Sequence, residues 1–304
     1  MAIAPDDHEQ WAALLVRDVT AFNQERHVLG LRRISLRGAD LSGRDLSGAE
    51  LSPADLTDAN LSRCRVPSLV SCRLERTRLD GATGDSLDLV RLIQLLWTDV
   101  AAFNAARPTV PVLQAVDLSR ADLRDADLRR AQLFNSNLEG ANLSGCAFHE
   151  TNLQDCNLRG ASFSNAKLKL DKLPGADASG ADFSGATLEH VRLNGATLVG
   201  ANFRDARLTG GGLATCDASG ANFDGALLQA LNVNKLIARG ARFHGATIDG
   251  VNFSYGDLRS ADFQGAKFED VTFDSVDLDG VDFRGADVSR IDFSTVENRD
   301  KARF

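Results

Sequence analysis

The sequence is poor in the residues that mark several protein classes. Its 304 residues include six Pro, five Cys, two Trp and one Tyr. So few prolines argue against a disordered, proline-rich chain, and an odd, sparse set of cysteines does not indicate a disulfide scaffold. No apolar run approaches about 18 residues, the length of a membrane-spanning helix, so we expect no membrane partner. The first residues, MAIAPDDHEQW, lack the basic and then apolar layout of a signal peptide, which predicts a cytoplasmic protein.

Positive charge is also in short supply. The chain has 34 Lys and Arg against 42 Asp and Glu, which gives a formal net charge of −8. Proteins that bind nucleic acids directly usually present a basic stripe, so this balance disfavours a direct nucleic-acid partner. Hydrophobic residues make up 43% of the chain, which is enough to build a sizeable core.

A repeat of five residues dominates the chain. From Ala39 it reads ADLSG, RDLSG, AELSP and ADLTD, and later ADLRD, ANLSG, ADFSG and ADFQG. The register holds from Leu118 to Phe293 without a slip. An α-helix rotates residues five apart by about 140°, and a simple strand alternates with a period of two, so neither explains the pattern. The period therefore predicts a coil in which each unit forms one short side and one corner, with the Leu or Phe and the small residue two before it pointing inward.

A longer period sets the number of sides. Phenylalanines recur at every fourth repeat unit, at Phe163, Phe183, Phe203, Phe223, Phe243, Phe263 and Phe283. Since each unit forms one side, a recurrence at every fourth unit gives four sides per turn. We therefore predict a square parallel β-solenoid with a ladder of Phe rings along one inner edge.

This pattern resembles the pentapeptide repeat family, whose motif is A(D/N)LXX. The resemblance covers about 36–84 and 113–295. It implies an all-β solenoid of a particular kind, a right-handed quadrilateral parallel β-helix. Two amphipathic α-helices that cap or interrupt the solenoid complete the predicted fold.

These two helices fall in segments that leave the repeat and resemble each other. Residues 8–26 place Trp11, Leu15, Val19 and Phe22 on one helical face, and residues 87–107 place Leu89, Leu92, Leu96, Val100 and Phe103 likewise. We therefore predict a duplicated module, with a helix and a short solenoid in 1–84 and a helix and a long solenoid of about nine coils in 85–304. The helices are interpreted as hydrophobic end caps, with a partner-binding surface as the alternative.

The stretch KLKLDKLPG at 167–175 fits the repeat worst. Asp171 falls at an inward position, where an unpaired carboxylate is costly. Two interpretations stay open from the sequence. Either the backbone bulges and puts Asp171 in solvent, or a local charge or backbone donor satisfies it. A recognition loop is a further alternative.

No constellation of residues indicates catalysis. The five cysteines occupy the inward positions where Ala is usual, which predicts buried core thiols. The histidines are scattered without metal-ligand spacing, and neither a phosphate-binding loop nor a nucleophile elbow is present. The glycines fit the corners of the coil and the aspartates belong to the repeat. We therefore expect no enzyme, no cofactor and no metal.

Charge is the informative surface feature. Residues 247–293 hold eleven acids and four bases, so nearly all of the net charge lies in the last coils. The acids are spread over all four faces, and a solvated end that discourages end-to-end stacking is one explanation. The other is a binding surface. Its candidate residues are Asp257, Asp262, Glu269, Asp270, Asp274, Asp277, Asp279 and Asp282.

A solenoid with flat faces and no cavity suits a non-catalytic scaffold whose partner is another protein. The family resemblance implies a more specific alternative, because some members mimic duplex DNA, bind type II topoisomerases such as gyrase, and protect them from quinolones. Two features depart from those members. Only STVENRDKARF follows the last unit, where they carry a C-terminal helix, and the acids here are confined to the last coils.

Overall fold

The computed structural model describes residues 3–30 and 32–304. The chain divides into two compact units. The first comprises 1–107 with 115–118, and the second comprises 108–114 with 119–304. The division of the chain at residues 84 and 85 stays a prediction. No helix in the described part of the chain is long and apolar enough to cross a membrane.

Each of the two predicted helices is a pair of helices. The first unit begins with α1 (His8–Arg17) and α2 (Val19–Leu29), and it later contains α3 (Leu87–Thr98) and α4 (Val100–Ala106). An aspartate separates the members of each pair. Asp18 accepts hydrogen bonds from the amides of Thr20 and Ala21, and Asp99 accepts one from the amide of Ala102. Each carboxylate satisfies amides at the start of the next helix, so the break is an N-cap.

The buried faces of these helices agree only in part with the expected ones. Trp11, Leu15 and Phe22 are buried as expected. In α3, Val90 and Ile93 are buried, whereas Leu89 and Leu92 are only half-buried. The expected face of α3 was therefore wrong at these positions. Its sequence, LDLVRLIQLLWT, is apolar almost all round, so the spacing does not single out one face.

The first unit also holds a short solenoid. The strands β1 (Ile34–Ser35) and β2 (Ala54–Asp55) pair in parallel, with Ile34 opposite Ala54. The strands β3 (Arg65–Val66) and β4 (Thr83–Gly84) also pair in parallel, but Arg65 lies opposite Thr83, so this turn of the coil is two positions shorter. A segment of three residues replaces one five-residue side here.

An arginine joins the helices of the first unit to this solenoid. The buried guanidinium of Arg26 on α2 donates hydrogen bonds to the carbonyls of Arg32, Ser52 and Pro53. A buried carbonyl without a donor is costly, so these bonds stabilise the packing of α2 on the coil. A side chain of the helix thereby supplies donors for backbone carbonyls at the start of the solenoid.

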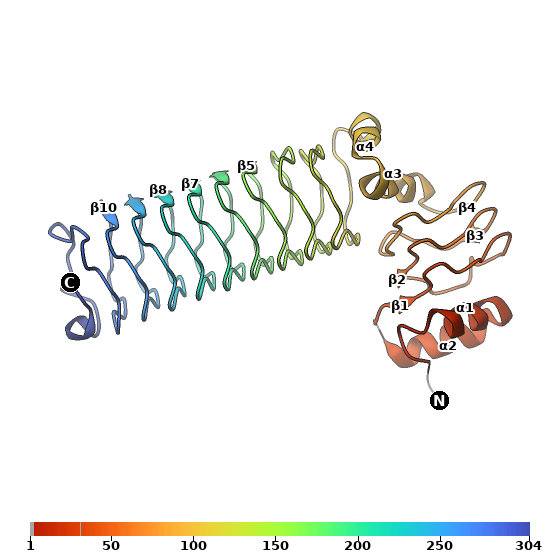
Figure 1. The fold of residues 1–304 in the computed structure, drawn as a ribbon, viewed down its shortest axis with the longest axis horizontal. Helices are drawn as coiled ribbons and strands as arrows, with labels where there is room; N and C mark the ends of the chain where they lie inside the picture. The colour runs from red at the N-terminus through yellow and green to blue at the C-terminus, as the bar shows by residue number, and fades with distance from the viewer. Residues whose placement is uncertain (1–2, 31) are drawn as a thin grey trace. The chain divides into compact units, whose positions relative to one another are not determined.

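The second unit contains the long solenoid. Its six-stranded sheet runs in chain order, and each strand pairs in parallel with the equivalent strand of the next coil, as Leu168 does with Leu188 (Figure 1). The strands are β5 (Lys167–Lys169), β6 (Thr187–Glu189), β7 (Arg207–Thr209), β8 (Leu227–Gln229), β9 (Thr247–Asp249) and β10 (Lys267–Glu269). Isolated parallel bridges with the same spacing join the other sides of the coils. These pairings confirm the parallel solenoid with four repeat units per turn.

The predicted Phe ladder is present. From Phe163 to Phe263 neighbouring rings stack nearly parallel, with centroids 4.5–4.9 Å apart. Phe283 continues the column at 5.4 Å, and Phe304 adds a last ring 5.5 Å beyond it. Phe304 falls one position later than the repeat would place it, because the short 3-10 helix η1 (Arg299–Lys301) lengthens that turn. The strict period of the column therefore does not reveal it.

Asp171 is buried and stays within the coil. One carboxylate oxygen accepts a hydrogen bond from the amide of Thr151 and the other from the amide of Lys169, each at 2.6 Å. The bulge that would place Asp171 in solvent is therefore the wrong interpretation, and backbone donors satisfy the carboxylate instead. Burial still raises the pKa of Asp171 to about 6, because it disfavours the charged form.

Candidate functional site at the acidic end

The acidic end consists of the last coils of the long solenoid, residues 247–293. We name its four faces after the Leu or Phe at the centre of each, which is half-buried in the case of Phe268 and buried in the other three. The Phe268 face includes 247–250 and 267–270, and the Phe273 face includes 252–255 and 272–275. The Leu278 face includes 257–260 and 277–280, and the Phe283 face includes 262–265 and 282–285.

The aspartate of the repeat has a structural task at this end. The side chain of Asp262 accepts a hydrogen bond from the amide of Gln264, and that of Asp277 accepts one from the amide of Asp279. Asp and Asn side chains favour such short-range bonds to the backbone two residues later. The acid before each central residue therefore stabilises a corner of the coil, whatever else it does.

On the Leu278 face the acids are neutralised by nearby cations. Asp257 lies 2.6 Å from Arg239 and 2.7 Å from Arg259, and Asp277 lies 3.8 Å from Arg259. The hydrogen bond from the Arg259 side chain is the main reason that the pKa of Asp257 falls to about 2. Asp279 lies 3.8 Å from Lys301. The face therefore presents little net negative charge.

The Phe283 face is also partly neutralised. The carboxylate of Asp282, which is buried, lies 2.7 Å from Arg284 and 3.9 Å from Arg303. The hydrogen bond from Arg284 lowers the pKa of Asp282. Asp262 forms no ion pair with any described residue, but it is half-buried beside the same arginine, whose charge it stabilises.

Among the described residues, the acids of the other two faces form no ion pair. Glu269 and Asp270 on the Phe268 face and Asp274 on the Phe273 face are exposed, and none forms an ion pair within the described residues. The side chain of Asp274 accepts a hydrogen bond from the hydroxyl of Thr295, at 3.2 Å. Asp287 and Asp292, which follow in the chain, are also exposed and lack an ion pair there. The uncompensated charge therefore gathers on two of the four faces.

The eight candidate residues thus fall into two sets of four. Asp257, Asp277, Asp279 and Asp282 form ion pairs, whereas Asp262, Glu269, Asp270 and Asp274 form none within the described part of the chain. A count of charges along the sequence does not separate the sets. One local sequence signal identifies two of the paired acids. Where an Arg follows an Asp by two residues, its side chain folds back onto that Asp, as Arg259 does onto Asp257 and Arg284 onto Asp282.

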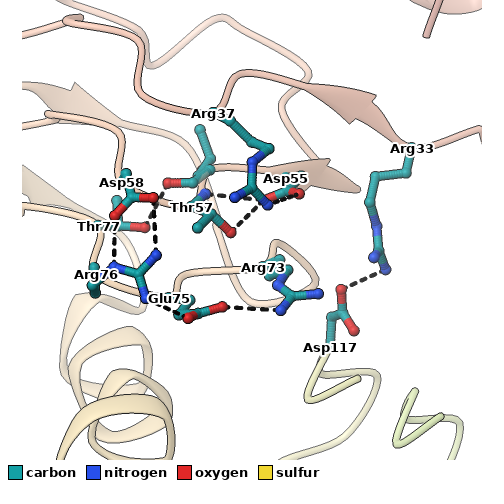
Figure 2. A network of polar contacts seen from close by, with 11 residues as sticks. Arg33, Arg37, Asp55, Thr57, Asp58, Arg73, Glu75, Arg76, Thr77 and Asp117 are labelled. Atoms are coloured by element: carbon teal, nitrogen blue, oxygen red, sulfur yellow. Dashed lines mark hydrogen bonds and ion pairs between the residues drawn. The ribbon is translucent and has the colours of Figure 1, made fainter. Parts of the chain in front are cut away.

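One cluster of charges in the first unit is also mutually compensated (Figure 2). Arg76 joins Asp58 and Glu75, and Arg73 lies 2.9 Å from Glu75. The carboxylate of Asp117, which is buried, lies 2.5 Å from Arg33. These pairs leave no run of free acids on this cluster, so the acidic end of the second unit stays the stronger candidate.

The cysteines lie where the repeat predicts them. All five are buried, and each thiol donates a hydrogen bond to a backbone carbonyl, for example Cys146 to Leu123 at 2.8 Å. Burial raises the pKa to about 12 for Cys72, Cys146, Cys156 and Cys216. These thiols are therefore protonated core residues and not nucleophiles. Across residues 3–30 and 32–304, no group of acids, histidines and cysteines is arranged to hold a metal ion.

The five-residue sides, the regular pairing from coil to coil and the stacked inner columns define the chain as a parallel β-solenoid. Two family models match more than half of it. The model described as a pentapeptide repeat region matches 126–203, and the model described as pentapeptide repeats in eight copies matches 31–66, 216–254, 232–265 and 257–294. The chain belongs to the pentapeptide repeat family.

Solved structures of similar proteins come from diverse sources. HetL, a pentapeptide repeat protein involved in the regulation of heterocyst differentiation in the cyanobacterium Nostoc, is 27% identical over 61% of this chain and 88% of its own, with a TM-score of 0.46. QnrB1, a plasmid-mediated fluoroquinolone resistance protein, is 25% identical over 60% of this chain and 92% of its own, with a TM-score of 0.47. A thylakoid-lumen protein of Arabidopsis thaliana is 25% identical over 43% and 70%, with a TM-score of 0.16. No curated protein matches the chain.

Proposed function

We propose that this pentapeptide repeat protein is a non-catalytic scaffold that binds another protein through the open acidic faces of its long solenoid. The open faces are the Phe268 and Phe273 faces, with Glu269, Asp270 and Asp274 at their centre. One observation supports the proposal: these acids form no ion pair among the described residues, while the acids of the neighbouring faces, apart from Asp262, are held in ion pairs. A surface whose charges are already paired offers little to a charged partner, whereas free acids steer and orient one.

The experiment compares matched variants of the full chain as bait in extracts of the source cells. The open-face variant carries Glu269→Gln, Asp270→Asn and Asp274→Asn. The control carries Asp257→Asn, Asp277→Asn and Asp279→Asn, and so removes the same formal charge from the Leu278 face. Proteins captured by the unmodified chain are quantified by mass spectrometry. We expect the open-face variant to lose them and the control to keep them. Equal capture by all three proteins, or equal loss from both variants, overturns the proposal.

A second candidate is protection of a type II topoisomerase through mimicry of DNA. The unpaired carboxylates on two adjacent faces favour it, since duplex DNA also presents a run of negative charges, about one per 1.7 Å of its axis. The test is a gyrase supercoiling assay with and without a fluoroquinolone. Supercoiling that is restored by the unmodified chain and not by the open-face variant supports this candidate. No effect at micromolar protein rejects it and leaves the scaffold proposal standing.

A further inference from the structure

The last strand of the long solenoid has an open edge. β10 pairs with β9 on one side and with no strand on the other within the described residues, and it lies just before the blue C-terminal end (Figure 1). On the Leu278 and Phe283 faces the final turn is closed, because the amides of Leu278 and Phe283 donate to the carbonyls of Glu297 and Arg303. The same terminal segment supplies Lys301 and Arg303 to those faces. The faces whose acids form no ion pair among the described residues are therefore also those that these terminal bonds do not close.

Two backbone donors mark this open edge. On the neighbouring Phe283 face the amide of Phe263 donates to the carbonyl of Asp282 at 2.8 Å. One coil earlier on the Phe268 face, the amide of Gly250 donates to the carbonyl of Glu269 at 2.9 Å. The same spacing would pair the amide of Phe268 with Asp287 and that of Asp270 with Ser289. Neither bond forms, and neither amide bonds to another described residue. An amide without a partner at a sheet edge is ready to pair with a further strand.

A cavity of about 620 Å³ lies between this edge and the chain that follows it. We call it the C-terminal slot, bounded by 268–272 and 287–292. Half-buried Phe268, Val271 and Ile291 give it an apolar side. Four acids and one base supply its charge: Glu269, Asp270, Asp287, Asp292 and Arg290. The slot therefore combines free backbone donors, apolar contacts and net negative charge.

We propose that the C-terminal slot binds an extended peptide segment of another protein in which Lys or Arg alternates with apolar residues. Such a segment adds a strand to β10. Its carbonyls accept hydrogen bonds from the amides of Phe268 and Asp270, and its own amides donate to backbone carbonyls of the same edge. Successive side chains of a strand point to opposite faces, so one set packs on Phe268 and Ile291 and the other meets the acids. A second copy of this chain is disfavoured as the occupant, because it would bring an acidic end against an acidic end.

This inference deepens the proposed function and rests on it only in assuming a protein partner. Its test uses the full chain and a fluorescent peptide of alternating Val and Lys, about seven residues long. A second peptide of the same sequence carries N-methyl groups at every other amide. One protein variant carries Asp270→Asn, Asp287→Asn and Asp292→Asn, and the control again carries Asp257→Asn, Asp277→Asn and Asp279→Asn. Amide exchange at Phe268 and Asp270 is followed by NMR with and without peptide.

We expect the unmodified chain and the control to bind the first peptide with equal affinity. N-methylation and the slot variant should each weaken binding about tenfold, and the peptide should slow exchange at both amides. Equal binding of the N-methylated peptide, unchanged binding by the slot variant, or amides already protected in the free chain overturns the inference. Because the protein partner is assayed separately with the open-face variant, a slot that binds no peptide leaves the scaffold proposal intact.

Discussion

The interior and the exterior of the long solenoid follow different rules. Inside, one column of phenylalanines repeats from Phe163 to Phe283 with nearly constant ring spacing. Outside, two faces of the acidic end carry mostly ion-paired acids and a closed last turn. Among the described residues, the acids of the other two faces form no ion pair, and β10 on one of them has an open edge. The same repeat therefore gives a uniform core and an uneven surface.

We infer from this difference that the buried residues determine the stability of the solenoid and that the outward residues determine what it binds. Each coil contacts only its neighbours, so a core residue acts through the coils above and below it. An outward residue at the middle of a face contacts mainly solvent and can change without disturbing the stack. We therefore expect interior substitutions to lower the free energy of unfolding and exterior ones to change binding or titration alone.

The largest effect is expected in the Phe ladder. Phe223 is buried between Phe203 and Phe243, with ring centroids 4.8 and 4.9 Å away. Phe223→Ala should lower the free energy of unfolding by about 3–5 kcal/mol, since it removes apolar burial and leaves a cavity. Urea unfolding measures the change. Val199→Ala, at a 40% exposed residue, is the control and should change it by less than about 0.5 kcal/mol. Similar losses from both variants would contradict the contrast between interior and exterior.

Asp171 is a buried acid in an otherwise apolar interior, so its substitution tests whether polar contacts also stabilise the core. Asp171→Val restores the apolar character of the repeat but leaves the amides of Thr151 and Lys169 without their acceptor. Each unsatisfied buried donor costs about 1–3 kcal/mol, which outweighs the gain from burying a methyl-bearing side chain. We expect urea unfolding to show a loss of about 2 kcal/mol or more. A stabilised variant would mean that the two hydrogen bonds contribute nothing.

The interior was predictable from the sequence because it repeats. Phe223 and its column follow from the recurrence of Phe at every fourth unit, and the buried cysteines follow from their place two residues before a Leu or Phe. Asp171 breaks the pattern, and its environment stayed open from the sequence because its two backbone donors are set by pairing between coils. Phe304 escaped prediction, since η1 lengthens its turn by one position.

The acidic end was predictable only as a local excess of charge. Which acids are free depends on how arginines fold back and on where the terminal segment closes the last turn. Arg259 lies two residues after Asp257, which is visible in the sequence. The pairing of Arg303 with Asp282 is not, because it depends on the shifted register of the final turn.

The pH dependence of stability gives a third test. The folded-state pKa of Asp171 is about 6, above the value of about 3.9 for an exposed Asp in an unfolded chain. The folded protein therefore holds this proton more tightly, so the free energy of unfolding should fall as pH rises from about 4 to about 6 and then level off. The contribution is about 3 kcal/mol. Asp171→Asn cannot titrate and should lack this decline. Parallel pH profiles for the two proteins would contradict the assignment.

The smallest effect is expected on a paired face. Arg259→Gln removes the hydrogen bond that contributes most to the low pKa of Asp257, while Arg239 remains 2.6 Å away. The pKa of Asp257 should therefore rise from about 2 only part of the way toward about 3.9. The urea midpoint should not change measurably, since exposed ion pairs contribute little to stability. NMR titration of the Asp257 carboxyl measures the shift, with Asp287 as the reference carboxyl. An unchanged pKa would show that the arginine does not neutralise this face, and the distinction between paired and open faces would then rest on the closed last turn alone.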